Sequence, residues 1–129
     1  MATFHCFEEI DCWQKARILT SEVYSMSGQQ MFAKDFGLRD QIRRTSVSIM
    51  SNIAEGFERS GTREFRQFLA ISKGSVGELK SQFYLALDQK YVSREAFDHL
   101  FKQASETGRM IGGLIIYLSK TNKKGSKYK

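Results

Sequence analysis

The chain has 129 residues, a net charge of +6, 41% hydrophobic residues, two cysteines and no proline. This length suits one domain that buries its own core without disulfides. Cys6 and Cys12 match neither a metal-ligand spacing nor a redox motif, so we expect two small apolar residues in a reducing compartment. No signal-peptide pattern opens the chain and no apolar stretch approaches the ~20 residues of a membrane span, so we expect a cytoplasmic protein.

The positive charge is concentrated at the C-terminal end. All 14 acidic residues precede position 119, whereas five of the 20 basic residues follow it: Lys120, Lys123, Lys124, Lys127 and Lys129. We therefore expect a nearly neutral domain over residues 1–119 and a basic, disordered tail over residues 120–129. Such a tail attracts phosphates in a salt-dependent way, or it only keeps the protein soluble; the sequence leaves both interpretations open.

The first predicted helix covers about residues 12–26, after an arm that carries Phe4 and Phe7. Asp11 resembles an N-cap, and Gln14 stands three residues later as in a capping box. Apolar residues recur on one side of this segment at helical spacing.

The second predicted helix covers about residues 35–59 and has two apolar stripes. The first stripe suits the core and contains Leu38, Ile42, Thr45, Ile49, Ile53 and Gly56. The second lies beside it and contains Arg39, Arg43, Val47, Met50, Ala54 and Phe57. A helix with two apolar sides needs two partners, so we predict that the second stripe is an oligomer interface. A helix buried more centrally within its own monomer is the alternative.

Two further helices are predicted over about residues 62–90 and 93–119. Thr62 and Ser93 are the expected caps, each followed by an acid in the first turn. Gly108, Gly112 and Gly113 indicate close helix packing, because glycine weakens a helix interior. The predicted fold class is all-α: an antiparallel up-down four-helix bundle that assembles as a homo-oligomer.

The side chains for catalysis are sparse. His5 and His99 are the only histidines, and no motif indicates a metal, a cofactor or a nucleotide. Arg94 and His99 form R-x-x-x-x-H, which resembles the short motif of HEPN ribonucleases. A spacing of five turns the two side chains about 140° apart on a helix, so such a site would need a dimer. We expect a protein that is not an enzyme, with a HEPN-like ribonuclease as one alternative.

Residues 38–59, LRDQIRRTSVSIMSNIAEGFER, resemble the four-helix-bundle family of 23S rRNA intervening-sequence proteins. Trp13-Gln14-Lys15-Ala16 and Lys73-Gly74-Ser75-x-x-Glu78-Leu79 extend the resemblance, which covers about residues 4–118. Its most specific part is the motif of Asn52, Glu55 and Gly56 after the arginines. Met50 departs from the family, which often has proline there, so we expect a straighter helix.

The resemblance implies a ring-like homopentamer. The family is also similar to the accessory variability determinants of diversity-generating retroelements, which are basic pentamers that bind a reverse transcriptase and its RNA. By that analogy, Arg39, Arg43, Arg44 and Arg59 would serve assembly or RNA contact. This is an analogy between folds.

The predicted function is a homo-oligomeric adaptor that binds nucleic acid, with RNA as the leading candidate and DNA as the other, through its basic surface. A reverse transcriptase is a further expected partner. A protein-interaction scaffold without a nucleic-acid role is the first alternative. The expected nucleic-acid contacts are Arg44, Arg59, Lys120, Lys123, Lys124 and Lys127. Tyr84, Tyr91 and Tyr128 are the aromatic candidates for base stacking. Asn52 and Glu55 either bind a ligand or only bond to neighbours such as Arg44 and Arg59.

Overall fold

The computed structural model describes the backbone of residues 4–122 and the side chains of residues 4–120. Every regular element in this part of the chain is helical, which confirms the predicted all-α class. The elements are the 3-10 helix η1 (Phe7–Glu9), α1 (Asp11–Ser27), α2 (Gln30–Lys34), α3 (Phe36–Glu58), α4 (Thr62–Asp88) and α5 (Arg94–Asn122).

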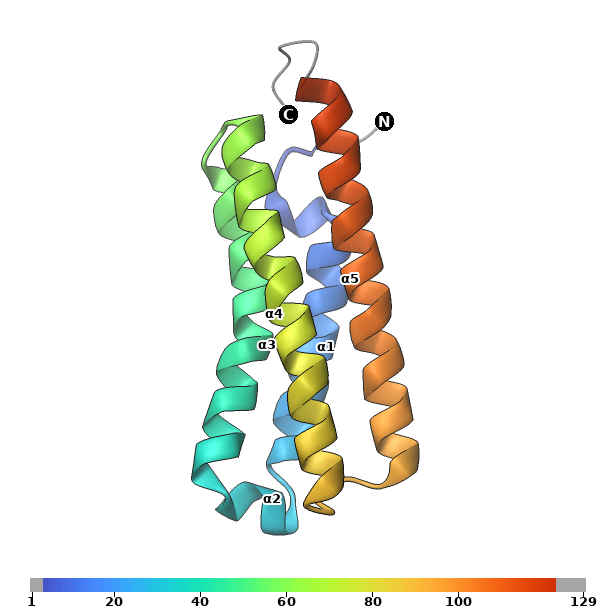
Figure 1. The fold of residues 1–129 in the computed structure, drawn as a ribbon. Helices are drawn as coiled ribbons and strands as arrows, with labels where there is room; N and C mark the ends of the chain where they lie inside the picture. The colour runs from blue at the N-terminus through green and yellow to red at the C-terminus, as the bar shows by residue number, and fades with distance from the viewer. Residues whose placement is uncertain (1–3, 123–129) are drawn as a thin grey trace.

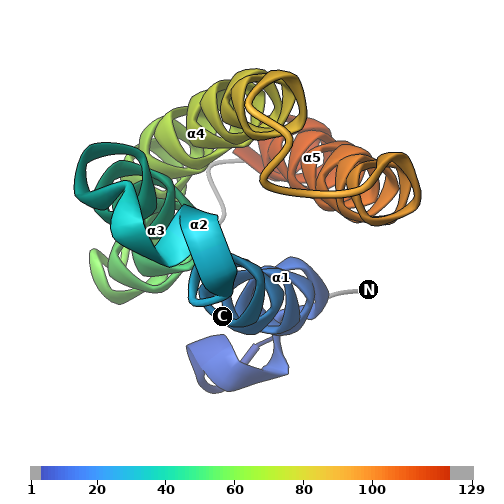
Figure 2. The same ribbon diagram turned by 90° about the horizontal axis from the view of Figure 1, so that it is seen from below.

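Four long helices lie side by side, and their connections alternate between the two ends of the molecule (Figure 1). α3 packs against both α1 and α4, and α4 packs against α5. In the view from below (Figure 2), α1 and α5 are the fourth pair of neighbours around the bundle. Their contact is the smallest of the four. None of the described helices is long and apolar enough to cross a membrane.

The core stripe of α3 is confirmed at most positions. Ile42, Ile49 and Ile53 are fully buried, and Leu38 at the start of the helix is only partly buried. Burial of such a side chain stabilises the fold by roughly 1.5–3 kcal/mol. Two hydroxyls tie this helix to its neighbours through main-chain oxygens: Thr20 of α1 donates to Ser46 O at 3.1 Å, and Ser72 of α4 donates to Ile49 O at 2.7 Å.

The expected capping box of α1 is wrong. Ile10 occupies the N-cap position, Asp11 is the first helical residue, and no side chain caps this end. The Gln14 amide instead donates to Glu8 O of η1 at 2.7 Å. η1 directly precedes the helix, and the buried Ile10 fixes the direction in which the chain enters α1.

The other predicted caps give mixed results. Gly61 is the N-cap of α4, so Thr62 is its first residue and not its cap. Ser93 caps α5 as predicted, because its hydroxyl accepts from Ala96 N at 3.0 Å. α5 continues to Asn122, beyond the predicted boundary at residue 119, so Lys120 is helical.

α2 was not predicted, and it changes the role of Tyr91. Asp35 follows α2 and caps α3 by accepting from Leu38 N at 3.1 Å. The Tyr91 hydroxyl donates to the same carboxylate at 2.8 Å, and its ring stacks on Phe32 at 5.0 Å. The Leu38 N–H and then this hydroxyl hold the pKa of Asp35 below its usual 3.8. Tyr91 therefore joins the α4–α5 connection to α2 and the start of α3, and it is not an exposed base-stacking residue.

Glycines mark close contacts between helices. A Cβ built on Gly56 would lie 2.6 Å from the Cβ of Phe68, so α3 and α4 meet there without room for a side chain. On α5, a Cβ would lie 3.3 Å from Val76 Cγ1 at Gly108 and 3.2 Å from Lys73 Cε at Gly112. The predicted tight packing holds at these two positions. At Gly113, nothing lies within 4 Å of such a Cβ.

Candidate nucleic-acid interface

A surface hollow between Tyr24 of α1 and the outer side of α3 gathers several predicted site residues. It has a volume of about 690 Å³ and is lined by Arg43, Arg44, Val47, Asn52 and Glu55, among others. Helical spacing explains this arrangement, because residues three and four positions apart share a face. The hollow holds charges of both signs, so its field does not favour an anion everywhere.

Arg43 contacts its own chain. Its Nε donates to Ser27 Oγ at 2.8 Å, its Nη2 donates to Tyr24 O at 3.2 Å, and the guanidinium lies 4.6 Å from the Tyr24 ring centre. A cation is favourable at the C-terminal end of a helix, where carbonyl oxygens lack partners. Arg43 thus locks the end of α1 onto α3, whereas its predicted role lay at an oligomer interface.

Arg39 is held in a similar way one turn earlier. Its Nε lies 2.9 Å from Asp40, and its Nη1 donates to Ala33 O at 3.1 Å. The guanidinium also lies 4.8 Å from the ring centre of Phe36. The contacts of Arg39 therefore position the α2–α3 corner.

Arg44 and Arg59 are both exposed, but the fold does not bring them together. Fifteen residues of one helix separate them by roughly 22 Å. Arg59 lies 2.7 Å from Glu55 and 5.0 Å from the ring centre of Phe68. Arg44 has no ion pair among the described residues. Arg44 is thus the more available cation of the two.

The family motif has local structural roles. The Asn52 amide donates to Ser48 O at 2.8 Å and to Ser48 Oγ at 3.0 Å, and that hydroxyl lies 3.0 Å from Ser75 Oγ of α4. Glu55 pairs with Arg59 one turn later, as one of the two open interpretations supposed. Together with Gly56, these residues join α3 to α4.

The second stripe of α3 is partly covered by the N-terminal arm. The Phe4 ring packs edge-on against Phe57 with centres 6.5 Å apart, and Met50 and Ala54 are half-buried. Val47 is 36% exposed and lines the hollow described above. Sequence reasoning missed this cover because a short arm has no periodicity to read.

The lysines assigned to the tail have two outcomes. Lys120 is exposed in the last turns of α5, and the C-terminal ends of α5 and α3 lie at the same end of the molecule (Figure 1). Arg59 directly follows α3. Lys123, Lys124 and Lys127 lie outside the described residues, as does Tyr128. The structure therefore places only Lys120 of the predicted tail contacts.

Arg94 and His99 have different partners. Arg94 pairs with Asp98 on its own helix at 3.3 Å, whereas His99 reaches Glu22 of α1 at 3.2 Å. Within residues 4–120, no three His, Cys, Asp or Glu side chains are grouped closely enough to hold a metal ion. Burial raises the pKa of the Cys12 thiol to about 12, which disfavours the reactive thiolate at neutral pH.

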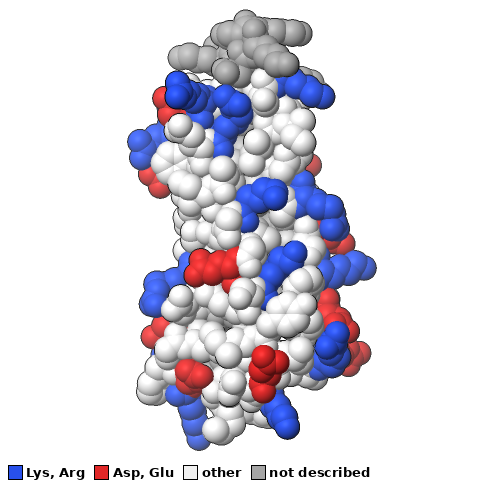
Figure 3. All heavy atoms as spheres, viewed as in Figure 1, with Lys and Arg blue, Asp and Glu red and all other residues white. Residues whose placement is uncertain are grey.

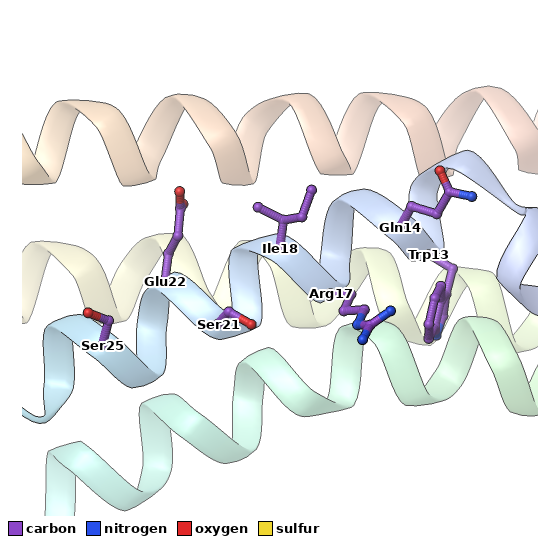
Figure 4. Close-up of a pocket in the computed structure, with 7 residues that line it drawn as sticks. All are labelled: Trp13, Gln14, Arg17, Ile18, Ser21, Glu22 and Ser25. Atoms are coloured by element: carbon purple, nitrogen blue, oxygen red, sulfur yellow. The ribbon is translucent and has the colours of Figure 1, made fainter.

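A second hollow, of about 470 Å³, lies on α1 (Figure 4). All seven residues that line it, from Trp13 to Ser25, belong to this one helix and follow its successive turns. Arg17 lies 5.7 Å from the Trp13 ring centre at one end of the hollow. A strip of one helix does not bring groups from different elements together, as substrate pockets commonly do.

These features define an all-α protein of four long helices in which some charged residues, such as Arg43 and Lys15, tie one helix to another. The chain belongs to the family of 23S rRNA-intervening sequence proteins, whose family model matches residues 8–113. This match confirms the resemblance found in the sequence.

One crystal structure shows a fold similar to that of this chain. It is that of a protein of unknown function from the S23 ribosomal protein family of Bacteroides thetaiotaomicron, with a TM-score of 0.74 and 20% sequence identity. The similarity covers 81% of this chain and 97% of that one, and it concerns the fold alone. No curated protein matches the chain.

Proposed function

We propose that this protein is a non-enzymatic, homo-oligomeric adaptor that binds RNA in the cytoplasm. Its unit is an antiparallel up-down four-helix bundle, and its assembly is a ring, pentameric by analogy with the family. In a retroelement, the adaptor would hold RNA beside a reverse transcriptase.

The unbalanced positive charge carries this proposal. The chain has 20 basic and 14 acidic residues, and the ion pairs of the described residues leave exposed cations such as Arg44 and Lys120 without a carboxylate. Phosphate contact depends mainly on such cations and not on base sequence. A ring repeats each of them around one axis and raises the potential near the surface.

The protein-scaffold alternative rests on a different observation. Met31 of α2 and Phe36 of α3 are 63% and 64% exposed at the same corner of the molecule. Exposed apolar side chains that cluster commonly mark protein contacts. A scaffold would bind its partner through this corner, and its affinity would respond weakly to salt.

RNA binding can be tested with a fluorescein-labelled RNA hairpin, the full chain and a chain that ends at Asn122. We expect the full chain to bind more weakly as salt rises. The shortened chain loses Lys123, Lys124, Lys127 and Lys129, so its logarithmic salt slope should fall by up to about 3 if each lysine neutralises one phosphate. Fluorescence anisotropy over a salt series measures both quantities.

Two results would contradict the proposal. Absence of binding even at low salt would favour the protein scaffold. Cleavage of the hairpin by the full chain, lost in His99→Ala, would favour the ribonuclease. An Arg17→Gln variant, altered at an exposed residue of α1, gives the effect of removing one charge outside the tail. The effect of removing the four tail lysines is compared with it.

A further inference from the structure

A groove between α4 and α5 contains none of the residues that the sequence nominated for nucleic-acid contact. It has a volume of about 640 Å³ and runs along the facing turns of both helices. Its charged lining residues are Lys73 and Lys80 of α4 and Arg109 of α5, and no carboxylate lines it. Figure 3 shows several Lys and Arg side chains in the middle of the face that these helices form, with an acidic side chain beside them that does not line the groove.

The three cations are available to a ligand. None of them forms an ion pair with another described residue. Lys80 lies 4.7 Å from the Phe101 ring centre, a contact that holds its ammonium at the groove and leaves it without a counter-charge. Arg109 contributes little to the lowered pKa of Glu106, because that carboxylate is paired with Lys15. The groove is therefore a site of uncompensated positive charge.

Glycines keep the walls of the groove low. Gly77 and Gly113 both line it, and a Cβ on either would meet nothing within 4 Å. Glycine destabilises a helix interior relative to alanine, and packing within this chain does not require it at these two positions. At Gly112, the missing side chain instead gives room to the alkyl stem of Lys73, whose Cε would lie 3.2 Å from a Cβ. The same helices thus position a cation and leave space above the backbone.

We infer that the α4–α5 groove binds the phosphate backbone of RNA, an inference that rests on the RNA-binding function proposed above. Seven residues separate Lys73 from Lys80, a rise of roughly 10 Å. Phosphates of one strand of duplex DNA repeat about every 3.4 Å along the helix axis, so cations at this separation can meet more than one phosphate of a nucleic-acid backbone. An acidic protein helix would also satisfy the charge, and Val76 and Ile116 would give it apolar contacts, so it is the alternative that the experiments below separate from RNA.

The first test removes the charge of the groove. Lys73→Gln, Lys80→Gln and Arg109→Gln are combined in one full-length variant. We expect its affinity for the RNA hairpin to fall roughly ten- to hundred-fold at moderate salt, and the logarithmic salt slope to fall by about 2, since three phosphate contacts disappear. Circular dichroism confirms that the variant folds.

The matched control removes the same charge elsewhere. Arg17→Gln, Lys34→Gln and Lys90→Gln change exposed residues outside the groove. We expect a loss of affinity at least tenfold smaller than in the groove variant, because only the overall attraction weakens. Equal losses in the two triple variants would overturn the groove while leaving the proposed RNA binding intact.

The second test fills the groove without changing charge. Gly77→Leu places a side chain over the groove, whereas Gly74→Leu places the same side chain on α4 outside it, again in open space. We expect both variants to fold and only Gly77→Leu to weaken RNA binding. Unchanged binding in Gly77→Leu would overturn the inference.

Two further outcomes separate the groove from its alternatives. A full chain that binds no RNA would overturn both the groove and the proposed function. Labelled polyglutamate serves as the probe for an acidic protein. The opposing outcome is that polyglutamate binds the full chain more tightly than the hairpin does, with this binding lost in the groove triple variant. That result would make an acidic protein, and not RNA, the occupant of the groove.

Discussion

Gly56 shows why the family motif needs glycine at one position. α3 and α4 approach each other so closely there that a Cβ would lie 2.6 Å from Phe68 Cβ and 3.1 Å from Phe65 Cδ1. Neither neighbour can swing away, because Phe65 is fully buried and the Cβ of Phe68 is fixed by its own backbone. The backbones themselves would have to separate.

Gly56→Ala should therefore destabilise the fold. Alanine gains about 1 kcal/mol in helix propensity, but overpacking costs about 1–3 kcal/mol, so we expect a net loss of up to about 2 kcal/mol. Gly74→Ala is the matched control: its Cβ enters open space, and we expect a gain of about 0.5–1 kcal/mol. Urea unfolding of both variants measures the difference, and equal or greater stability of Gly56→Ala would contradict the packing argument.

At the residue scale, the sequence predicted which face of a helix a residue occupies better than it predicted which residue that side chain contacts. The core positions of α3 and the Glu55–Arg59 pair follow from helical spacing, which the chain itself encodes. The partners of Arg39 and Arg43 do not, because they depend on where α2 and the end of α1 fold back. The α4–α5 groove was missed for the same reason: its cations come from two helices.

The seam between α1 and α5 depends on few polar contacts. Lys15 of α1 lies 3.0 Å from Glu106 and donates to Gln103 at 2.6 Å, and His99 reaches Glu22 near the other end. The hydrogen bond that Lys15 donates to Glu106, and then the charge of Lys15, hold the pKa of Glu106 below its usual 4.5. Lys15 thus links the first and last helices of the bundle.

Lys15→Met should lower the urea midpoint at neutral pH, and the effect should depend on pH. A carboxylate with a lowered pKa in the folded state contributes stability above its unfolded value of 4.5, and this contribution disappears as pH falls through the folded value. The difference in urea midpoint between wild type and variant should therefore become smaller in acid. Lys34→Met, at an exposed residue without an ion pair, should show no such narrowing; a gap that stays constant with pH would contradict the role of Glu106.

At the element scale, long periodic segments were predictable and short ones were not. The four long helices begin and end within about three residues of their predicted limits. α2 and η1 are too short to show a period, and η1 displaces the cap of α1 that local sequence rules had suggested. Asp11 lost its expected role because η1 and Ile10 precede it directly.

For the whole molecule, assembly decides whether scattered cations act together. A single copy presents the basic groove and Arg44 on different helices, whereas a ring would align equivalent sites around one axis. The N-terminal arm covers Phe57 but leaves Val47 exposed, so the uncovered part of the second stripe is centred on Val47. An interface on this stripe would have to bury that residue.

Val47→Glu should break the assembly without unfolding the chain. Its side chain already meets solvent in one copy, so a carboxylate there is tolerated, but a charge buried between subunits without a partner is costly. Light scattering after size exclusion should give a multiple of 14.8 kDa for wild type and a single copy for the variant. Ile71→Glu, an exposed change on α4, is the control. A wild-type mass of one copy, or equal dissociation of the control, would contradict an interface on α3. The second stripe would then serve only the packing of the monomer.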